Sequence, residues 1–217
     1  MTFQQLKDAL LVNARQADVC GAYQDILIAN NEQDIIAAGL PLLEWAYRTG
    51  ILTDSLLNEF DEPTLNANGV YRTGVHVLNN PVGDLYFLGN SSATINLSGT
   101  SKCKVFSVTT SVIEENLADS SYIVNKIFSG TIVLTQNDKS ISCNEMKNSV
   151  GSNITVHGET VAHIKVYEGN ILNLNTTDDA FIRLQGFYNS ITNGNEASSQ
   201  PVVVEMNQTA QYNTSAL

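Results

Sequence analysis

Two short stretches of the chain combine ionisable side chains at spacings that could support chemistry. His157 and His163 flank Glu159, an arrangement that could hold a metal ion or transfer protons. Asp178 and Asp179 are adjacent and could be the paired carboxylates of a glycan-cleaving enzyme. Both stretches lie in the second half of the chain, so the elements expected there decide how the side chains point.

Those elements argue against both sites. Period-two alternation places His163 on the outer face of a strand, and His157 falls at the corner before Gly158. Asp178 and Asp179 are expected in a turn with the two threonines that precede them. We therefore predict no catalytic residue and no metal ligand.

Glu114 and Glu115 lie in the stretch from Thr109 to Ser121, where the spacing of apolar residues is irregular. This stretch could be a loop or an inserted strand, and we expect both carboxylates to be solvated. The chain also contains no glycine-rich phosphate loop and no GxSxG nucleophile motif, so no cofactor is predicted.

Aromatic side chains of the same region suggest binding. Tyr167, Phe181, Phe187 and Tyr188 could form a sugar-binding strip, or they could pack between successive turns of the chain. Tyr167, Phe187 and Tyr188 are our candidate glycan contacts.

The composition limits the possible partners. Charged residues make up 15% of the 217 residues, the formal net charge is −11 and the pI is near 4.5. An acidic chain without basic clusters is not expected to bind nucleic acid or an anionic membrane surface. The hydrophobic fraction of 43% is large enough for a packed core.

Three cysteines, Cys20, Cys103 and Cys143, form an odd set without CxxC spacing, which disfavours a disulfide framework or a zinc site. Cys103 and Cys143 occupy positions expected to face the core.

A five-residue pattern recurs in the second half of the chain: a small or polar residue, then two apolar residues at intervals of two. The copies are Ala93-Ile95-Leu97, Gly130-Ile132-Leu134, Ser152-Ile154-Val156, Ala162-Ile164-Val166, Asn170-Leu172-Leu174 and Ala180-Ile182-Leu184. Each copy predicts a strand with one apolar face. Pairs of copies recur at about 18 to 20 residues, which predicts a β-solenoid of four to six rungs. The spacing does not follow the hexapeptide rule of the left-handed acyltransferase solenoids.

The first 62 residues have helical periodicity. Phe3, Leu6 and Leu10 begin an apolar stripe, and Asp18, Asn31 and Thr53 are candidate N-caps of three further helices. Pro41 should kink or restart the helix that follows Asn31.

The predicted fold is α+β and mostly β: a small N-terminal helical bundle followed by a short β-solenoid, similar to a right-handed β-helix. The expected segments are a helical head for capping or docking (1–62), a transition (63–90), the solenoid (91–206) and a flexible tail (207–217).

The chain resembles small uncharacterised proteins encoded by phages and prophages of Bacteroidota. The resemblance rests on Val19-Cys20-Gly21-Ala22-Tyr23, on Gly39 and Trp45, on Leu56 to Phe60, and on Gly69-Val70-Tyr71 before the small-x-Ile-x-Val repeats. It implies a phage setting and supplies no catalytic residues.

Two functional hypotheses follow. The first is a non-enzymatic virion structural protein: a head fibre, a decoration protein or a tail-associated adhesin. It would be a homo-oligomer, with a trimer favoured, would bind other virion proteins through its helical N-terminus, and could contact a cell-surface glycan. The N-terminus does not resemble a signal peptide, so such a protein would be made in the host cytoplasm and released by lysis. The alternative is a carbohydrate-active enzyme on a short β-helix, acting on capsular or mucin glycan.

Overall fold

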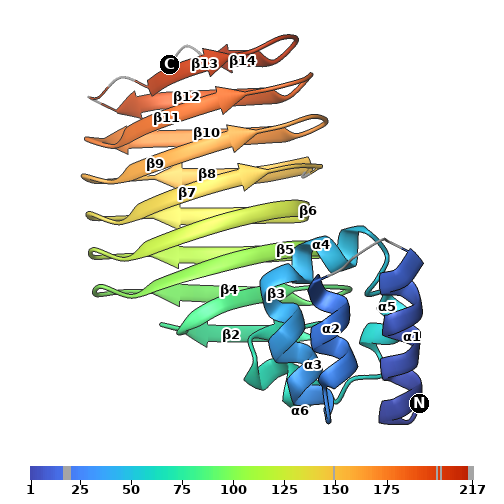
Figure 1. The fold of residues 1–217 in the computed structure, drawn as a ribbon. Helices are drawn as coiled ribbons and strands as arrows, with labels where there is room; N and C mark the ends of the chain where they lie inside the picture. The colour runs from blue at the N-terminus through green and yellow to red at the C-terminus, as the bar shows by residue number, and fades with distance from the viewer. Residues whose placement is uncertain (17–20, 149, 199, 201, 215–217) are drawn as a thin grey trace. The chain divides into compact units, whose positions relative to one another are not determined.

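The computed structural model describes residues 1–16, 21–148, 150–198, 200 and 202–214. The chain divides into two compact units, Met1–Arg72 and Thr73–Leu217. The first is helical and the second is built from strands stacked in parallel (Figure 1).

The helical unit contains six short α-helices and one 3₁₀ turn within its described residues. They are α1 (Phe3–Gln16), α2 (Gly21–Ile28), α3 (Glu32–Gly39), η1 (Leu40–Leu42), α4 (Leu43–Arg48), α5 (Asp54–Leu57) and α6 (Glu62–Ala67), followed by the short strand β1 (Val70–Tyr71).

The starts of these helices follow local capping chemistry. The Asn31 side chain accepts a hydrogen bond from the Asp34 backbone N–H at 2.9 Å, which confirms the predicted cap of α3. The Thr53 hydroxyl does the same for α5, with Leu56 as donor. Asp18, the third predicted cap, lies outside the described residues.

Two prolines of the helical unit lie where helices begin, one at a predicted restart and one in a helix that was not predicted. Pro41 falls in the 3₁₀ turn η1, so the predicted restart of the helix is confirmed. Helix α6 is not among the predicted elements. Its cap, Asp61, accepts from the Thr64 backbone N–H at 3.0 Å, and Pro63 stands in its first turn, where a missing N–H costs nothing.

The second unit confirms the predicted β-solenoid and has about seven turns. Each turn places one strand on each of two faces. The first face contains β2 (Val75–Asn79), β4 (Ser92–Leu97), β8 (Val150–Val156), β10 (Ile171–Asp178), β12 (Ile191–Ser198) and β14 (Gln211–Thr214). The second contains β3 (Gly83–Phe87), β7 (Ile141–Met146), β9 (Val161–Val166), β11 (Phe181–Gly186) and β13 (Val202–Met206).

Two long strands contribute to both faces. β5 (Lys102–Leu117) and β6 (Tyr122–Gln136) each begin on the second face and end on the first. The irregular stretch from Thr109 to Ser121 therefore contains the second half of β5, which pairs regularly with β6 from Val112 to Leu117 after register shifts between Ser107 and Val112. The turn count exceeds the predicted four to six because β2 and β3, before residue 91, and β14, after residue 206, also belong to the stack.

The register keeps equivalent residues in rows along the solenoid. Leu174, for example, pairs with Ile154 on one side and with Gly194 on the other, each 20 residues away. Inward side chains of successive rungs therefore stack in apolar columns, and a single strand needs no core of its own.

The corners leading from the first face to the second contain residues with positive φ in line with one another. Asp119, Asp138 and Asp178 have φ of 58°, 60° and 59°. Their carboxylates accept hydrogen bonds from the backbone N–H of Gly99, Asp119 and Gly158, respectively, at 2.8, 3.1 and 3.2 Å. Each corner is thus tied to the corner of the preceding rung.

The segment boundaries differ from the predicted ones. The helical unit extends to Arg72, because α6 and β1 add to it. The solenoid unit starts at Thr73, so β2 and β3 belong to the stack and not to a transition. The predicted flexible tail contains β14, which pairs in parallel with β12.

One of the two core predictions for the cysteines is wrong. Cys103 is buried as predicted, at 5% exposure. Cys143 faces outward and is half-buried, because Ser142, Asn144 and Met146 are the inward residues of β7. Cys20 lies outside the described residues.

Candidate binding surfaces of the solenoid

The structure brings together two of the three predicted glycan contacts. Tyr167 follows β9 and Phe187 follows β11, one rung later, and their rings stack at 4.8 Å with 12° between planes. Tyr188 is the next residue, in a left-handed conformation with φ of 45°, and is 48% exposed. Phe181, at the other end of β11, is not part of this pair.

The stacked pair belongs to a longer column. Lys147, one rung before Tyr167, places its ammonium nitrogen 5.1 Å from the centre of the Tyr167 ring and 4.9 Å from that of Phe128. Phe128 in turn lies 5.3 Å from Phe106. Both faces of Tyr167 and one face of Phe187 are therefore covered by protein. A sugar could stack only on the other face of Phe187 or on Tyr188, so the packing interpretation explains most of this column.

A different surface has the more regular polar chemistry. Asn153, Asn173, Asn193 and Asn213 occupy one outward row on four successive strands of the first face. The side-chain amides of Asn173, Asn193 and Asn213 each donate to the amide oxygen of the asparagine one rung earlier, at 3.0, 3.1 and 3.2 Å, and Asn153 begins the row. We call this row the long asparagine ladder.

A second, shorter ladder lies near the start of the solenoid. Asn96 donates to Asn79 at 2.8 Å, and Asn116 donates to Asn96 at 2.9 Å. In both ladders the amide groups are fixed in orientation by one another, at the rung spacing of about 4.8 Å.

The long ladder borders a groove of about 360 Å³. Asn175 and Asn195 form its other side, two residues further along β10 and β12. The backbone of Gly194 and the last described residue, Thr214, complete the lining.

The sequence itself contains a signal for this surface. Asn153, Asn173, Asn193 and Asn213 are spaced by 20 residues, the same interval as the later rungs. Asparagine is common in the turns of β-structures, so its abundance alone does not indicate a surface of this kind. Equal spacing at positions within strands does indicate a ladder.

The interior of the solenoid contains a chain of buried polar side chains. The Asn125 amide donates to Glu115 Oε2 at 2.7 Å and to Asn144 Oδ1 at 2.8 Å. The Asn144 amide donates to Ser142 at 2.9 Å, and the Ser142 hydroxyl donates to Gln136 at 2.7 Å. This chain joins β5, β6 and β7 through the core.

Glu115 is the ionisable residue of that chain, and its placement corrects our expectation of a solvated carboxylate. It is completely buried, in the row between Ile95 and Leu134, because the alternation of β5 turns it inward. Burial raises the pKa of Glu115 to about 8, and the hydrogen bond from Asn125 acts in the opposite direction by lowering it. Among the described residues, Glu115 Oε1 and Asn125 Oδ1 have no partner. Enclosed in the core, Glu115 is not placed to act on a substrate.

The other candidate chemical groups have structural roles or stay apart. His163 is exposed on β9, as predicted, and His157 lies at a corner with its Nδ1 2.6 Å from the Thr177 hydroxyl. Asp178 ends β10 at the predicted turn and accepts from Gly158. Within the residues described, no three His, Cys, Asp or Glu side chains gather as a metal site.

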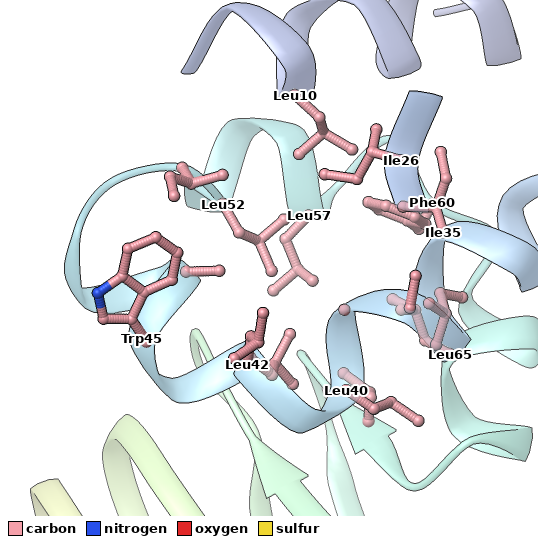
Figure 2. A pocket seen from close by; sticks show the side chains of 17 residues that line it. Leu10, Ile26, Ile35, Leu40, Leu42, Trp45, Leu52, Leu57, Phe60 and Leu65 are labelled. Atoms are coloured by element: carbon pink, nitrogen blue, oxygen red, sulfur yellow. The ribbon is translucent and has the colours of Figure 1, made fainter. Parts of the chain in front are cut away.

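The helical unit contains a small, partly open apolar pocket of about 60 Å³ (Figure 2). Leu10, Ile26, Ile35, Leu57 and Leu65, each from a different helix, contribute to its lining. The volume corresponds to about two water molecules, and an apolar lining gives water no partner. It is a gap in the packing of short helices. No described helix has the length and apolar character needed to cross a membrane.

The fold and surfaces define a two-unit α+β protein whose larger part is a parallel β-solenoid with asparagine ladders. Neither the family models, the curated proteins nor the solved structures contain a match to this chain.

Proposed function

We propose that the protein is a non-enzymatic structural component of a phage particle, a head fibre, decoration protein or tail-associated adhesin whose solenoid displays a binding surface. The observation that supports it is the long asparagine ladder, which repeats one neutral polar group at the same position on four rungs. A repeated, rigid surface suits a displayed body because a polymeric partner meets the same contact several times.

The helical unit is proposed to attach the chain to other virion proteins. Val12, Leu27 and Ile28 on α1 and α2 are 51%, 44% and 70% exposed. We propose that these exposed apolar side chains contribute to the attachment surface. The solenoid is proposed to assemble as a homo-oligomer, with three copies as the favoured number.

Mass spectrometry of particles purified from the source culture tests this proposal. We expect peptides of this chain in the particles, and a native mass of three chains for the purified protein. A monomer that is absent from particles would contradict the proposal. Cleavage of a glycan by the wild type but not by Asp178→Asn would instead favour the enzymatic alternative.

A further inference from the structure

We propose that the groove beside the long asparagine ladder is a binding site for an uncharged glycan chain. The inference deepens the proposed function, on which it rests for its biological setting. It locates the binding surface on β10, β12 and β14 of the first face, where the described lining differs from the predicted contacts Tyr167, Phe187 and Tyr188.

The groove presents amide groups on a regular grid. Along the solenoid axis, neighbouring rungs are about 4.8 Å apart, and along a strand the outward positions are about 6.7 Å apart. Asn173, Asn193 and Asn213 form one side of the grid, and Asn175 and Asn195 form the other. The volume of about 360 Å³ lies at the lower end of the range of about 300–1,000 Å³ for small-molecule sites.

The hydrogen-bonding capacity that the ladder leaves over suits hydroxyl groups. Asn193 donates once, to Asn173 at 3.1 Å, and accepts once, from Asn213 at 3.2 Å. A side-chain amide has two donor hydrogens and two acceptor lone pairs, so one of each remains per rung. A sugar hydroxyl both donates and accepts, and a chain of sugars offers such groups at intervals.

The lining also disfavours other classes of ligand. Its described residues are five asparagines, one threonine and one glycine, and none of these has a charged side chain. An anionic polymer or a charged peptide finds no counter-charge there. An apolar segment would displace water from the amides without replacing the hydrogen bonds that the water made. A neutral, hydroxyl-rich chain meets neither penalty.

The ladder prepares the site for binding before the ligand arrives. Because each amide is held by the next, its rotamer is already fixed and binding costs little side-chain entropy. Several weak contacts along the axis would then add up in a polymer and stay weak in a monosaccharide.

The test uses the full chain and an array of neutral oligosaccharides of increasing length, with glucose, mannose, galactose and xylose backbones. Polygalacturonate and sulfated glycans serve as charged probes. We expect binding to at least one neutral series, with affinity that rises with length and depends little on salt. Titration calorimetry then follows the best neutral probe.

Two matched variants locate the site. Asn193→Ala removes the middle of the long ladder, and Asn96→Ala makes the same change in the middle of the short ladder. We expect Asn193→Ala to weaken binding about tenfold or more, and Asn96→Ala to leave it within about twofold. Comparable thermal unfolding of both variants would show that the difference arises at the groove.

Several results would overturn the proposal: no binding to any neutral probe, binding to charged probes alone, or equal loss in the two variants. A change of oligomeric mass in Asn193→Ala would mean that a second copy of the chain occupies this face, as asparagine ladders do in stacked sheets. These outcomes are separate from those for the virion setting, since absence from particles would not alter glycan binding by the purified chain.

Discussion

Replacing Glu115 by glutamine removes an ionisable group from the centre of the solenoid without changing its shape. The carboxyl is fully buried and its pKa rises from 4.5 to about 8 because burial disfavours the charged form. In the unfolded chain the group titrates at its ordinary value, so the folded solenoid retains a proton between these two limits. Stability should therefore fall as pH rises from about 4.5 to about 8, and this group should cause no further change above that range.

The magnitude follows from the size of the shift. At about 1.4 kcal/mol per pKa unit, the complete penalty is about 5 kcal/mol, a large fraction of the stability of an ordinary domain. Between about pH 5.5 and about pH 8.5, the wild type should lose about 3 kcal/mol that Glu115→Gln retains. The glutamine amide can also donate to Asn125 Oδ1, which has no partner among the described residues.

Urea unfolding at several pH values measures the effect. Far-UV circular dichroism reports the strands, and the fluorescence of Trp45, the single tryptophan of the chain, reports the helical unit. Glu114→Gln is the matched control, because Glu114 is the exposed neighbour on the outer side of the same strand. The reasoning would be refuted if wild type and Glu115→Gln lost stability in parallel as pH rises, or if Glu114→Gln behaved like Glu115→Gln.

Two further perturbations test the corners and the core. In urea unfolding, Gly158→Ala should destabilise the solenoid by about 2 kcal/mol and Gly99→Ala by about 1 kcal/mol. Both glycines have positive φ, which a residue with a Cβ adopts at a cost. The larger cost is expected at Gly158 because a Cβ there would also lie 3.0 Å from the Asp138 carbonyl oxygen. Equal costs would show that the corner backbone can adjust. Burial and the negative charges of Glu115 and Asp84 raise the pKa of Cys103 to about 12. Because the thiolate is the reactive form, iodoacetamide should modify Cys103 at least about tenfold more slowly than half-buried Cys143. Peptide mass spectrometry follows the two rates. Similar rates would mean that β5 opens readily.

The solenoid could be predicted because its signal is local. In Ala162-Ile164-Val166 the inward residues are apolar and the outward ones polar, so period-two alternation alone identifies the buried face. The spacing of such segments then indicates stacking. The caps at Asn31 and Thr53 are local in the same way.

The errors occur where the interior is polar. Asn125, Asn144 and Glu115 face inward and are joined by hydrogen bonds, while Ile141 on the outer side is 39% exposed. In these rungs the polar side chains face inward and some apolar ones face outward, so hydropathy wrongly places Cys143 in the core and Glu115 in solvent. The partners that make a buried polar group acceptable come from other strands, and single-strand patterns contain no information about them.

The groove required information of another kind. The asparagine spacing is visible in the sequence, but the interactions depend on the register between strands. Once the register is known, equal spacing within strands becomes a row of contacts. The aromatic column illustrates the converse, since side chains selected for their chemistry are largely occupied by one another.

The equal length of the later rungs has a consequence for how such a chain can evolve. From Val161 to Phe181, and from Ile182 to Val202, corresponding residues are 20 positions apart without a bulge. Duplicating or deleting one such block in the gene would shift every later row by one rung and leave each alternation intact. The solenoid can therefore change length in whole units, and the number of asparagines along its face would change with it.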